Sequence, residues 1–346
     1  MNWGGAARLT YVDEALVDAA RAGDHAAFAQ LAEPYRRELQ VHCYRMLGSV
    51  EDAEDAVQET FLRAWARLDS FAARAPFRAW LYGIATHACL DALRRKKARV
   101  WPSDLSEPAD PSNYALSAVD LPWLSPYPDR LLEAAAAADG EPEAVVTSKE
   151  TIELAFLAAI QRLPARQRAV LILRDVLDWS AKETAAALDM SQAAVNSALQ
   201  RAHATLAEHL PASRGEWTSS SNATDQALLQ RLINAWEHSD TAALVGLLRN
   251  DARMVMPPGL IWFAGRDSIE IFLREHVFGE MGTDWRLLPT AANRQPAFGL
   301  YWRSPEESVH RAFAVCVVRF EDGAIAEISA FQQPELFAWF ALPAAL

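Results

Sequence analysis

Apolar side chains in the stretch 77–99 recur every three or four residues. Trp80, Ile84 and Ala88 form one such series. This period predicts one long helix with a face packed on a core. The stretch ends in more cations than the dipole of a helix C-terminus requires, namely Arg94, Arg95, Lys96, Lys97 and Arg99. Such a helix can stack on bases while its basic end holds phosphates, although a helix with a solvated basic end fits the pattern equally well.

Helical periodicity also covers the chain before this stretch. We predict a short helix over 14–22, a second over 24–47 with Asp24 as its N-cap, and a third from about Ser49. The third helix carries a row of carboxylates on its outer face, followed by Arg63. A solvated surface helix held by salt bridges is the ordinary interpretation of such a row.

Between 100 and 140 the helical pattern is lost. Six prolines exclude long helices, and acidic residues are frequent, so this stretch is predicted to be a linker between domains. A purely flexible tether would not need aromatic side chains, whereas this stretch contains Trp101, Trp123 and Tyr127. We therefore expect this linker to pack against another surface. A second linker, rich in small polar residues, is predicted over 211–222.

Two capping boxes mark helix starts between 141 and 210. The first is Thr147–Glu150; the second, Ser180–Glu183, opens a short helix, and a tight turn then leads to Ser191, the N-cap of a helix over 192–206. This order is the signature of a helix-turn-helix, although a plain helical hairpin has the same pattern. The exposed side chains of the last helix that could contact DNA are Gln192, Asn196, Ser197, Gln200 and Arg201.

The segment 223–346 mixes helical and strand patterns, which predicts a domain of its own. Glu321-Asp-Gly323 between two apolar runs is a strong hairpin signal. We expect three helices and a curved antiparallel sheet to form an α+β cone. The predicted helices cover 225–238, 240–249 and 265–278, and the predicted strands cover 252–256, 285–288, 297–302, 309–320 and 324–331.

Composition narrows the function classes. A net charge of −12 over 346 residues argues against a protein that coats nucleic acid indiscriminately, so any such binding must use local basic patches. Cys43, Cys89 and Cys316 lie far apart, which argues against a disulfide framework or a zinc site and fits a reducing cytosol. No signal peptide or membrane-spanning apolar run is visible. We therefore expect a soluble cytoplasmic protein without a metal, a cofactor or membrane contact.

The stretches 52–65 and 77–95 resemble region 2 of sigma-70-class RNA polymerase sigma factors, and most of all the extracytoplasmic-function (ECF) group. The resemblance implies that the acidic helix docks on the clamp helices of the largest polymerase subunit through Asp52, Asp55, Gln58 and Glu59. It also implies that 68–76 and the following helix capture and melt the promoter −10 element. The residues implied to contact DNA there are Arg78, Trp80, Thr86, His87, Arg94, Arg95, Lys96 and Lys97. Family members often carry Arg-Asn or Thr-Asn where this chain has Thr86-His87, which leaves the preferred −10 bases open.

The block at 141–210 resembles sigma region 4, which implies that it reads the −35 element and contacts the flap of the second-largest subunit. The linker at 100–140 is then implied to thread the RNA-exit path of the polymerase. Family members usually carry Lys or Arg where this chain has Asn196, and Arg where it has His203. Because each lost phosphate contact reduces electrostatic affinity, weak intrinsic −35 binding is expected.

The C-terminal segment resembles SnoaL-like domains, the fold shared with ketosteroid isomerase. Met-Pro-Pro at 256–258, Trp-Phe-Ala-Gly-Arg-Asp at 262–267 and the final hairpin carry this resemblance. Such cones have a pocket at the wide end, which implies a small-molecule ligand as a candidate partner. The candidate lining residues are Trp236, Met254, Met256, Trp262, His276, Trp302 and Phe331.

No catalytic residue is predicted in this pocket. Proton-transfer members of the fold use an acid with a raised pKa in an apolar site. The acids near the pocket strands are Asp251, Asp267 and Glu327; the first follows a helix end and the second resembles a helix cap. The chain is accordingly not expected to be an enzyme.

These observations combine into a three-domain sigma factor. Region 2 covers 10–99, region 4 covers 141–210, and a SnoaL-like regulatory domain covers 223–346. One alternative is a SnoaL-like enzyme of the isomerase or cyclase type, tethered to a DNA-binding module. A second alternative is a helix-turn-helix repressor with a ligand sensor, although such a repressor has no use for an acidic polymerase-docking helix.

Overall fold

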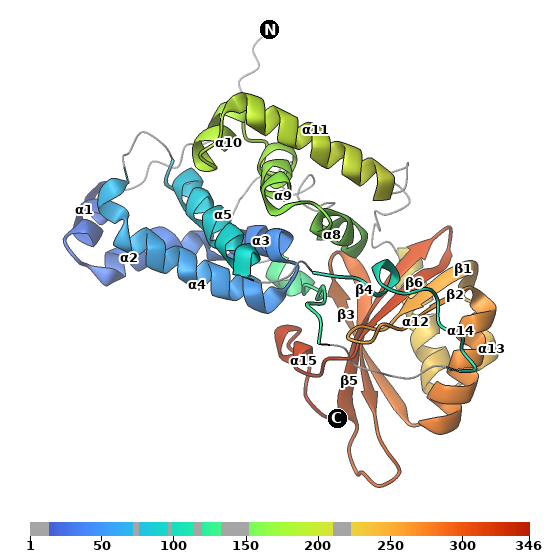
Figure 1. The fold of residues 1–346 in the computed structure, drawn as a ribbon. Coiled ribbons are helices and arrows are strands. Elements are labelled where there is room, and N and C mark those ends of the chain that lie inside the picture. Colours follow the sequence, from blue (N-terminus) through green and yellow to red (C-terminus); the bar gives the residue numbers. More distant parts are fainter. Residues whose placement is uncertain (1–13, 72–75, 96–98, 114–119, 133–151, 210–222) are drawn as a thin grey trace. The chain divides into compact units, whose positions relative to one another are not determined.

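The computed structural model describes residues 14–71, 76–95, 99–113, 120–132, 152–209 and 223–346, which form two compact units (Figure 1). The helical unit takes its described residues from Met1–Ala98 and Gln161–Leu206. The second unit contains the sheet and takes its described residues from Arg99–Glu133, Val145–Ile160 and Ala207–Leu346. The described part of the predicted 100–140 linker therefore belongs to the unit that contains the sheet.

Pro34 divides the helix that the apolar pattern predicts over 24–47. The proline lies in a 3-10 turn, Glu33–Tyr35, since its ring and missing N–H do not fit a helix interior. Asp24 is the N-cap as predicted, and its carboxylate accepts two backbone hydrogen bonds at 2.8 and 3.1 Å. Gly48 ends the second half with a left-handed φ of 67°. The helices here are α1 (Glu14–Arg21), α2 (His25–Ala32), α3 (Arg36–Leu47), α4 (Val50–Ala66) and α5 (Phe77–Arg95).

The later helices of this unit follow Pro164, which occupies the N-cap position of α9. The predicted capping box of α10 is confirmed, because Ser180 and Glu183 exchange hydrogen bonds of 2.8 and 3.2 Å. The box predicted at 147–150 lies outside the described residues. The elements are α9 (Ala165–Leu171), a π-helical turn (Ile172–Val176), α10 (Ala181–Ala187) and α11 (Gln192–His209). The preceding helix α8 (Leu154–Gln161) belongs, up to Ile160, to the second unit.

The second unit is built on a six-stranded sheet with the order β2-β1-β6-β5-β4-β3. The sheet is mixed rather than wholly antiparallel as predicted, because β1 runs parallel to β6. The hairpin signal is confirmed: Asp322 and Gly323 have φ angles of 52° and 74°, as a tight β-hairpin requires. The strands are β1 (Leu248–Val255), β2 (Trp262–Ala264), β3 (Trp285–Ala292), β4 (Gln295–Trp302), β5 (Arg311–Glu321) and β6 (Ala324–Phe331).

Helices cover one face of the sheet and the C-terminal segment covers the other, so β4 is buried on both faces (Figure 1). Phe298 and Leu300 point into the core beneath the helices. Gly299 faces the other way, where a Cβ would lie 2.7 Å from Leu342 and 3.1 Å from Phe337, so the close approach of the C-terminal segment requires glycine. The helices are α12 (Ala223–Glu237), α13 (Thr241–Val245), α14 (Arg266–Phe272) with a π-helical continuation (Leu273–Glu280), and α15 (Leu336–Trp339).

The described linker residues pack along this unit, as their aromatic content predicts. Ala109 N–H donates to the Trp262 carbonyl at 2.8 Å, and the Trp262 indole donates to the Ser106 carbonyl at 2.9 Å. Trp101 lies 5.9 Å from the Phe331 ring. This segment is therefore held by backbone and ring contacts to strands more than a hundred residues away.

Candidate functional sites

The outer face of α4 carries the residues predicted to bind the polymerase. Ser49 caps the helix, which starts with acidic residues that complement its dipole. Asp55 and Gln58 are exposed, whereas Asp52 is half-buried. The four predicted residues differ in exposure, because positions 55 and 58 point most directly away from the core.

Leu62 was not predicted and belongs to the same face. Its side chain is 66% exposed, the largest exposed fraction among the large apolar residues of the described chain. It lies four residues after Gln58 and seven after Asp55, so the three side chains form one row along the helix. The signal in the sequence was a leucine at the helical spacing of a polar row.

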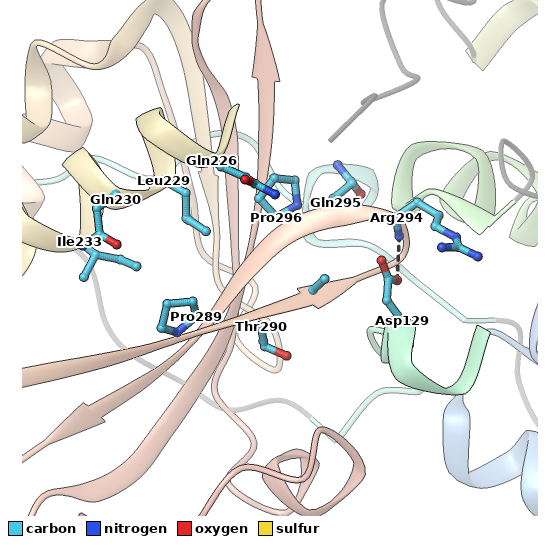
Figure 2. A pocket seen from close by; sticks show the side chains of 11 residues that line it. Asp129, Gln226, Leu229, Gln230, Ile233, Pro289, Thr290, Arg294, Gln295 and Pro296 are labelled. Carbon is cyan, nitrogen blue, oxygen red and sulfur yellow. Dashed lines mark hydrogen bonds between the residues drawn. The ribbon is translucent and has the colours of Figure 1, made fainter. Parts of the chain in front are cut away.

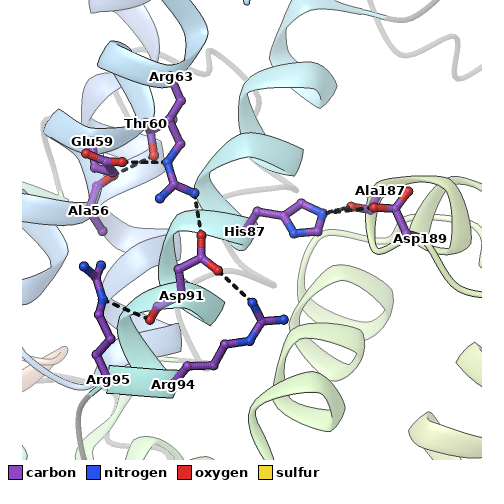
Figure 3. A network of polar contacts seen from close by, with 10 residues as sticks. All are labelled: Ala56, Glu59, Thr60, Arg63, His87, Asp91, Arg94, Arg95, Ala187 and Asp189. Atoms are coloured by element: carbon purple, nitrogen blue, oxygen red, sulfur yellow. Dashed lines mark hydrogen bonds and ion pairs between the residues drawn. The ribbon is translucent and has the colours of Figure 1, made fainter.

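Glu59, the fourth predicted residue, is engaged in an ion-pair network (Figure 3). Its carboxylate accepts from Arg63 Nε at 2.6 Å, and Arg63 Nη1 donates to Asp91 of α5 at 2.7 Å. The Arg63 guanidinium holds the pKa of Asp91 below its usual value. This network joins α4 to α5, so Glu59 has a structural role besides the predicted one.

The start of α5 orders two predicted DNA-contact residues. Arg78 donates to the Glu38 carboxylate at 2.6 to 3.0 Å and lies 5.0 Å from the centre of the Tyr82 ring. Trp80 is half-buried, with Phe71 and Phe77 at ring distances of 5.2 and 5.5 Å. Both side chains keep part of their surface accessible.

Thr86 is fully buried, which corrects its predicted DNA contact. Its hydroxyl donates to the Tyr82 carbonyl at 2.7 Å and therefore accepts from His42 Nε2 at 2.9 Å. Burial lowers the pKa of His42 to about 3, so the ring is neutral. A hydroxyl occupied in this interior pair cannot reach a base.

His87 and the basic end of α5 lie on the accessible side of the helix. His87 is half-buried and contacts the carbonyl of Ala187 at 2.9 Å. Arg94 and Arg95 are exposed, and Arg94 also pairs with Asp91 at 3.0 Å. Lys96 and Lys97 lie outside the described residues.

The helix-turn-helix presents four of its five predicted residues to solvent. Gln192, Asn196, Gln200 and Arg201 are exposed along α11. Ser197 is half-buried and accepts a hydrogen bond from Arg201 at 2.9 Å. The opposite face of α11 is buried through Val195, Ala198 and Ala202.

In the C-terminal domain, most of the predicted pocket residues belong to the core. Trp236, Met254, Met256 and Phe331 are at most 2% exposed, and Trp262 is 9% exposed. The Trp236 ring has Phe278, Trp285 and Phe298 as neighbours at 5.8 to 6.4 Å. Trp302 is half-buried, and its indole donates to the Met281 carbonyl at 2.9 Å. Most of the predicted pocket residues are therefore buried side chains of this domain.

His276, the remaining candidate, holds the linker. Its Nε2 donates to the Pro111 carbonyl at 2.9 Å, and its Nδ1 lies 3.0 Å from Glu280. Two of the three candidate acids pair with polar or charged neighbours. Asp251 is paired with Arg249 at 2.8 Å, which lowers the pKa of the carboxyl, and Glu327 accepts from Ser329 at 3.0 Å.

A groove of about 370 Å³ lies at the tip of the β3–β4 hairpin (Figure 2). Leu229 and Ile233 of α12 form one side, Pro296 of the hairpin forms another, and Asp129 of the linker closes one end. Asp129 accepts from the Arg294 backbone N–H at 2.8 Å. None of the seven predicted pocket residues lines this groove, and the prediction of a small-molecule ligand gains no support from it.

Among the described residues, no group of three or more His, Cys, Asp or Glu side chains could hold a metal ion. Within the same residues, no helix is long and apolar enough to cross a membrane.

The chain has the sequence features of two sigma-70 regions. Family models of sigma-70 region 2 and of sigma-70 region 4 match residues 31–99 and 153–206. The first match contains α3, α4 and α5, and the second contains the helix-turn-helix. The helical unit is therefore of the sigma-70 class, as the resemblance implied.

The relatives narrow this class. The ECF RNA polymerase sigma factor SigG of Mycobacterium tuberculosis (strain CDC 1551 / Oshkosh) is 40% identical over 327 residues, which cover 94% of this chain and 86% of that protein. SigW of Bacillus subtilis (strain 168) is 32% identical over 191 residues, or 54% of this chain and 91% of that protein. The chain belongs to the ECF RNA polymerase sigma factors. Its partners are core RNA polymerase and promoter DNA, and it directs promoter-specific transcription initiation.

A solved structure supports the fold of the whole chain. The crystal structure of the Mycobacterium tuberculosis ECF sigma factor SigJ aligns with a TM-score of 0.58, covering 91% of this chain and 99% of that one, at 22% identity. The predicted fold class is confirmed: helical regions 2 and 4 are followed by a domain of helices on a curved sheet.

Proposed function

We propose that the exposed row of α4 is the surface that binds the clamp helices of the largest polymerase subunit. The observation that carries this proposal is the combination of Asp55, Gln58 and the exposed Leu62 on one helix face. Apolar side chains surrounded by polar ones are typical of the energetic centre of an interface. The capped and buried inner side of α4 keeps this row rigid.

Charge reversal tests the docking surface. Asp55→Lys combined with Gln58→Lys should weaken binding to core polymerase by about thirtyfold or more, the scale of an interface hot spot. Asp18→Lys on α1 is the matched control, since Asp18 is also exposed but lies on another helix. Unchanged core affinity of the double variant, with native circular dichroism, would contradict the proposal.

The proposed promoter surface is the exposed face of α11 for the −35 element, together with α5 for the −10 element. Side-chain amides reach base edges, whereas guanidinium groups commonly contact phosphates. Arg201→Ala should therefore weaken binding to all promoters about equally. Gln192→Ala or Asn196→Ala should instead relax base preference at the −35 element, by about 1–3 kcal/mol for a bidentate contact. Equal loss on every sequence would move these two residues to the phosphate class.

The proposed role of the C-terminal domain is to modulate initiation by binding the linker. Its support is the set of contacts that Tyr127, Asn293 and Trp262 make between the linker and the sheet. A linker that is packed on this domain must leave it in order to enter the RNA-exit path. Deletion of the residues after 211 should change transcription by the reconstituted holoenzyme strongly. Equal activity of the full-length and truncated chains would contradict this role and favour the enzyme alternative.

A further inference from the structure

We propose that the groove between α12 and the outer edge of β3 binds an extended acidic peptide of a protein partner, which pairs with the backbone of β3 as an added strand. This groove has a volume of about 370 Å³ (Figure 2). All of its lining residues belong to the second unit. Such binding would be additional to the polymerase and promoter surfaces and is independent of them.

The backbone of β3 has hydrogen-bonding groups that face away from the sheet, because β3 is an edge strand. The two-residue turn at 293–294 makes Ala292 and Gln295 the hydrogen-bonded pair that closes the β3–β4 hairpin. Bonded and non-bonded pairs alternate along an antiparallel ladder. The outward backbone groups are therefore those of Leu287, Pro289 and Ala291.

Both ends of this outward edge are closed by other parts of the domain. The Leu287 N–H donates to Glu237 Oε1 of α12 at 2.9 Å, and the Asn293 N–H donates to the Tyr127 carbonyl at 2.9 Å. The segment 289–291 lies between these two closures and lines the groove. An open stretch of strand edge is a template for another strand, so this segment can pair with an added peptide.

The opposite wall of the groove is α12, whose side chains suit a peptide. Leu229 and Ile233 lie four residues apart and are mostly buried, so they form an apolar floor. Gln226 and Gln230 also lie four residues apart but are exposed, and their amides can bond to a peptide backbone. Peptides that add a strand to a sheet are recognised in this way, by main-chain bonds along one side and pockets for alternate side chains.

Arg294 determines the charge of the expected peptide. Its φ of 61° is left-handed, at the turn position where a hairpin of this length usually has glycine. An arginine is strained there, and the turn itself does not require it. Arg294 Nε is buried without a hydrogen-bond partner among the described residues, while Asp129 accepts from the backbone N–H. A carboxylate is the natural partner of a guanidinium, so the peptide should carry acidic side chains.

A single peptide fits this groove better than a second copy of the chain. The helix α12 lies beside β3, so the β3 edge of another copy would bring its own α12 into the same space. An added extended chain needs only the spacing between neighbouring strands, about 4.8 Å.

The test titrates the full-length chain with two fluorescein-labelled hexapeptides, Glu-Val-Glu-Val-Glu-Val and Lys-Val-Lys-Val-Lys-Val. Both peptides can extend as strands, and they differ in charge. The acidic peptide should bind at least about tenfold more tightly, because it can form charge-assisted hydrogen bonds with Arg294. Its binding should slow hydrogen exchange at Ala291 by about tenfold or more. Exchange at Leu287 should not change, since that N–H is already bonded to Glu237.

The variant Arg294→Gly separates binding from folding. Glycine relieves the left-handed strain, so the thermal midpoint should not fall, while the affinity for the acidic peptide should drop about tenfold. Gln226→Lys should strengthen binding and Gln226→Glu should weaken it, by about threefold each. Arg231→Ala is the matched control, because Arg231 is an exposed arginine of α12 that does not line the groove. Its affinity should equal that of the parent chain.

Several results would overturn the peptide site. They are no binding of the acidic peptide at about 1 mM, equal affinity for both peptides, or the same affinity in Arg294→Gly and Arg231→Ala. Unchanged exchange at Ala291 with bound peptide would also exclude strand pairing. Dimerisation of the free chain that protects Ala291 would assign the edge to a second copy instead. If Arg294→Gly lowers the thermal midpoint, the two Gln226 variants decide, and equal affinities in that pair would overturn the site.

Discussion

The helical unit and the C-terminal domain use comparable side chains in opposite ways. In the helical unit, the polar residues of α4 and α11 lie on outer faces, as their spacing predicts. In the C-terminal domain, Trp236 was predicted to line a cavity. Its ring packs against the rings of Trp285 and Phe298. A polar row at helical spacing must face solvent, whereas an apolar set can either line a cavity or fill it. Exposed positions were therefore easier to predict from the sequence than the packing of interior ones.

Truncation of a core ring should have the largest effect on stability. Trp236→Ala removes a buried indole and should cost about 3–5 kcal/mol of unfolding free energy in the C-terminal domain. Calorimetric unfolding of the full-length chain measures this change. Trp80→Ala, whose ring is half-buried in the helical unit, is the comparison variant and should cost clearly less. Similar costs would mean that Trp236 faces a cavity rather than a packed core.

The second prediction concerns the attachment of the linker. Asn293 is fully buried; its side chain accepts from Tyr127 N–H at 2.7 Å and donates to the Ile152 carbonyl at 2.6 Å. Asn293→Gly keeps the left-handed backbone, with φ of 55°, but removes the side-chain partner of the Tyr127 N–H and of the Ile152 carbonyl. The loss should lower the unfolding free energy by about 2–3 kcal/mol. Hydrogen exchange at Tyr127 should accelerate by more than tenfold, whereas exchange in α4 should not change. Unaltered protection of Tyr127 would show that other contacts hold the linker.

The third prediction is a pH dependence confined to the helical unit. Burial lowers the folded-state pKa of His42 to about 3, below the value of about 6.5 in the unfolded chain. Between these values the unfolded state binds the extra proton, so this contribution is fully present above about pH 6.5 and is lost as the pH falls toward 3. From pH 6.5 to 5 the loss should be about 2 kcal/mol. Urea unfolding at both pH values measures it; a His42→Gln variant should show a flatter dependence, and an equal slope would assign the effect to other groups.

The smallest stability effect is expected on the outer face of α4. Leu62→Ala removes an exposed side chain and should change the unfolding free energy by less than about 0.5 kcal/mol. The same change should weaken core polymerase binding by about fivefold or more if Leu62 lies at the centre of the interface. Titration of labelled protein with core polymerase checks this. Unchanged affinity would restrict the interface to the polar members of the row.

Local signals predicted much of the fold. The Ser180–Glu183 capping box, the turn before α11 and the Asp322–Gly323 hairpin are all present, because each depends on residues close together in the sequence. Pro34 was overlooked as a break in the second helix, although proline chemistry is itself a local signal. The short strand β2 (Trp262–Ala264) was also missed, since three residues are too few for a periodic pattern.

The sequence by itself determined the elements, the capping residues and the outward polar faces of α4 and α11, because periodicity and cap chemistry act within a few residues. Only the tertiary structure decided which side chains became interior. Thr86 is buried in contact with His42, 44 residues earlier, and Arg168 is buried in contact with the Met46 carbonyl, 122 residues earlier. The linker packs on the sheet through Asn293, 166 residues beyond Tyr127. Such contacts depend on how the elements pack, and no local pattern encodes that packing.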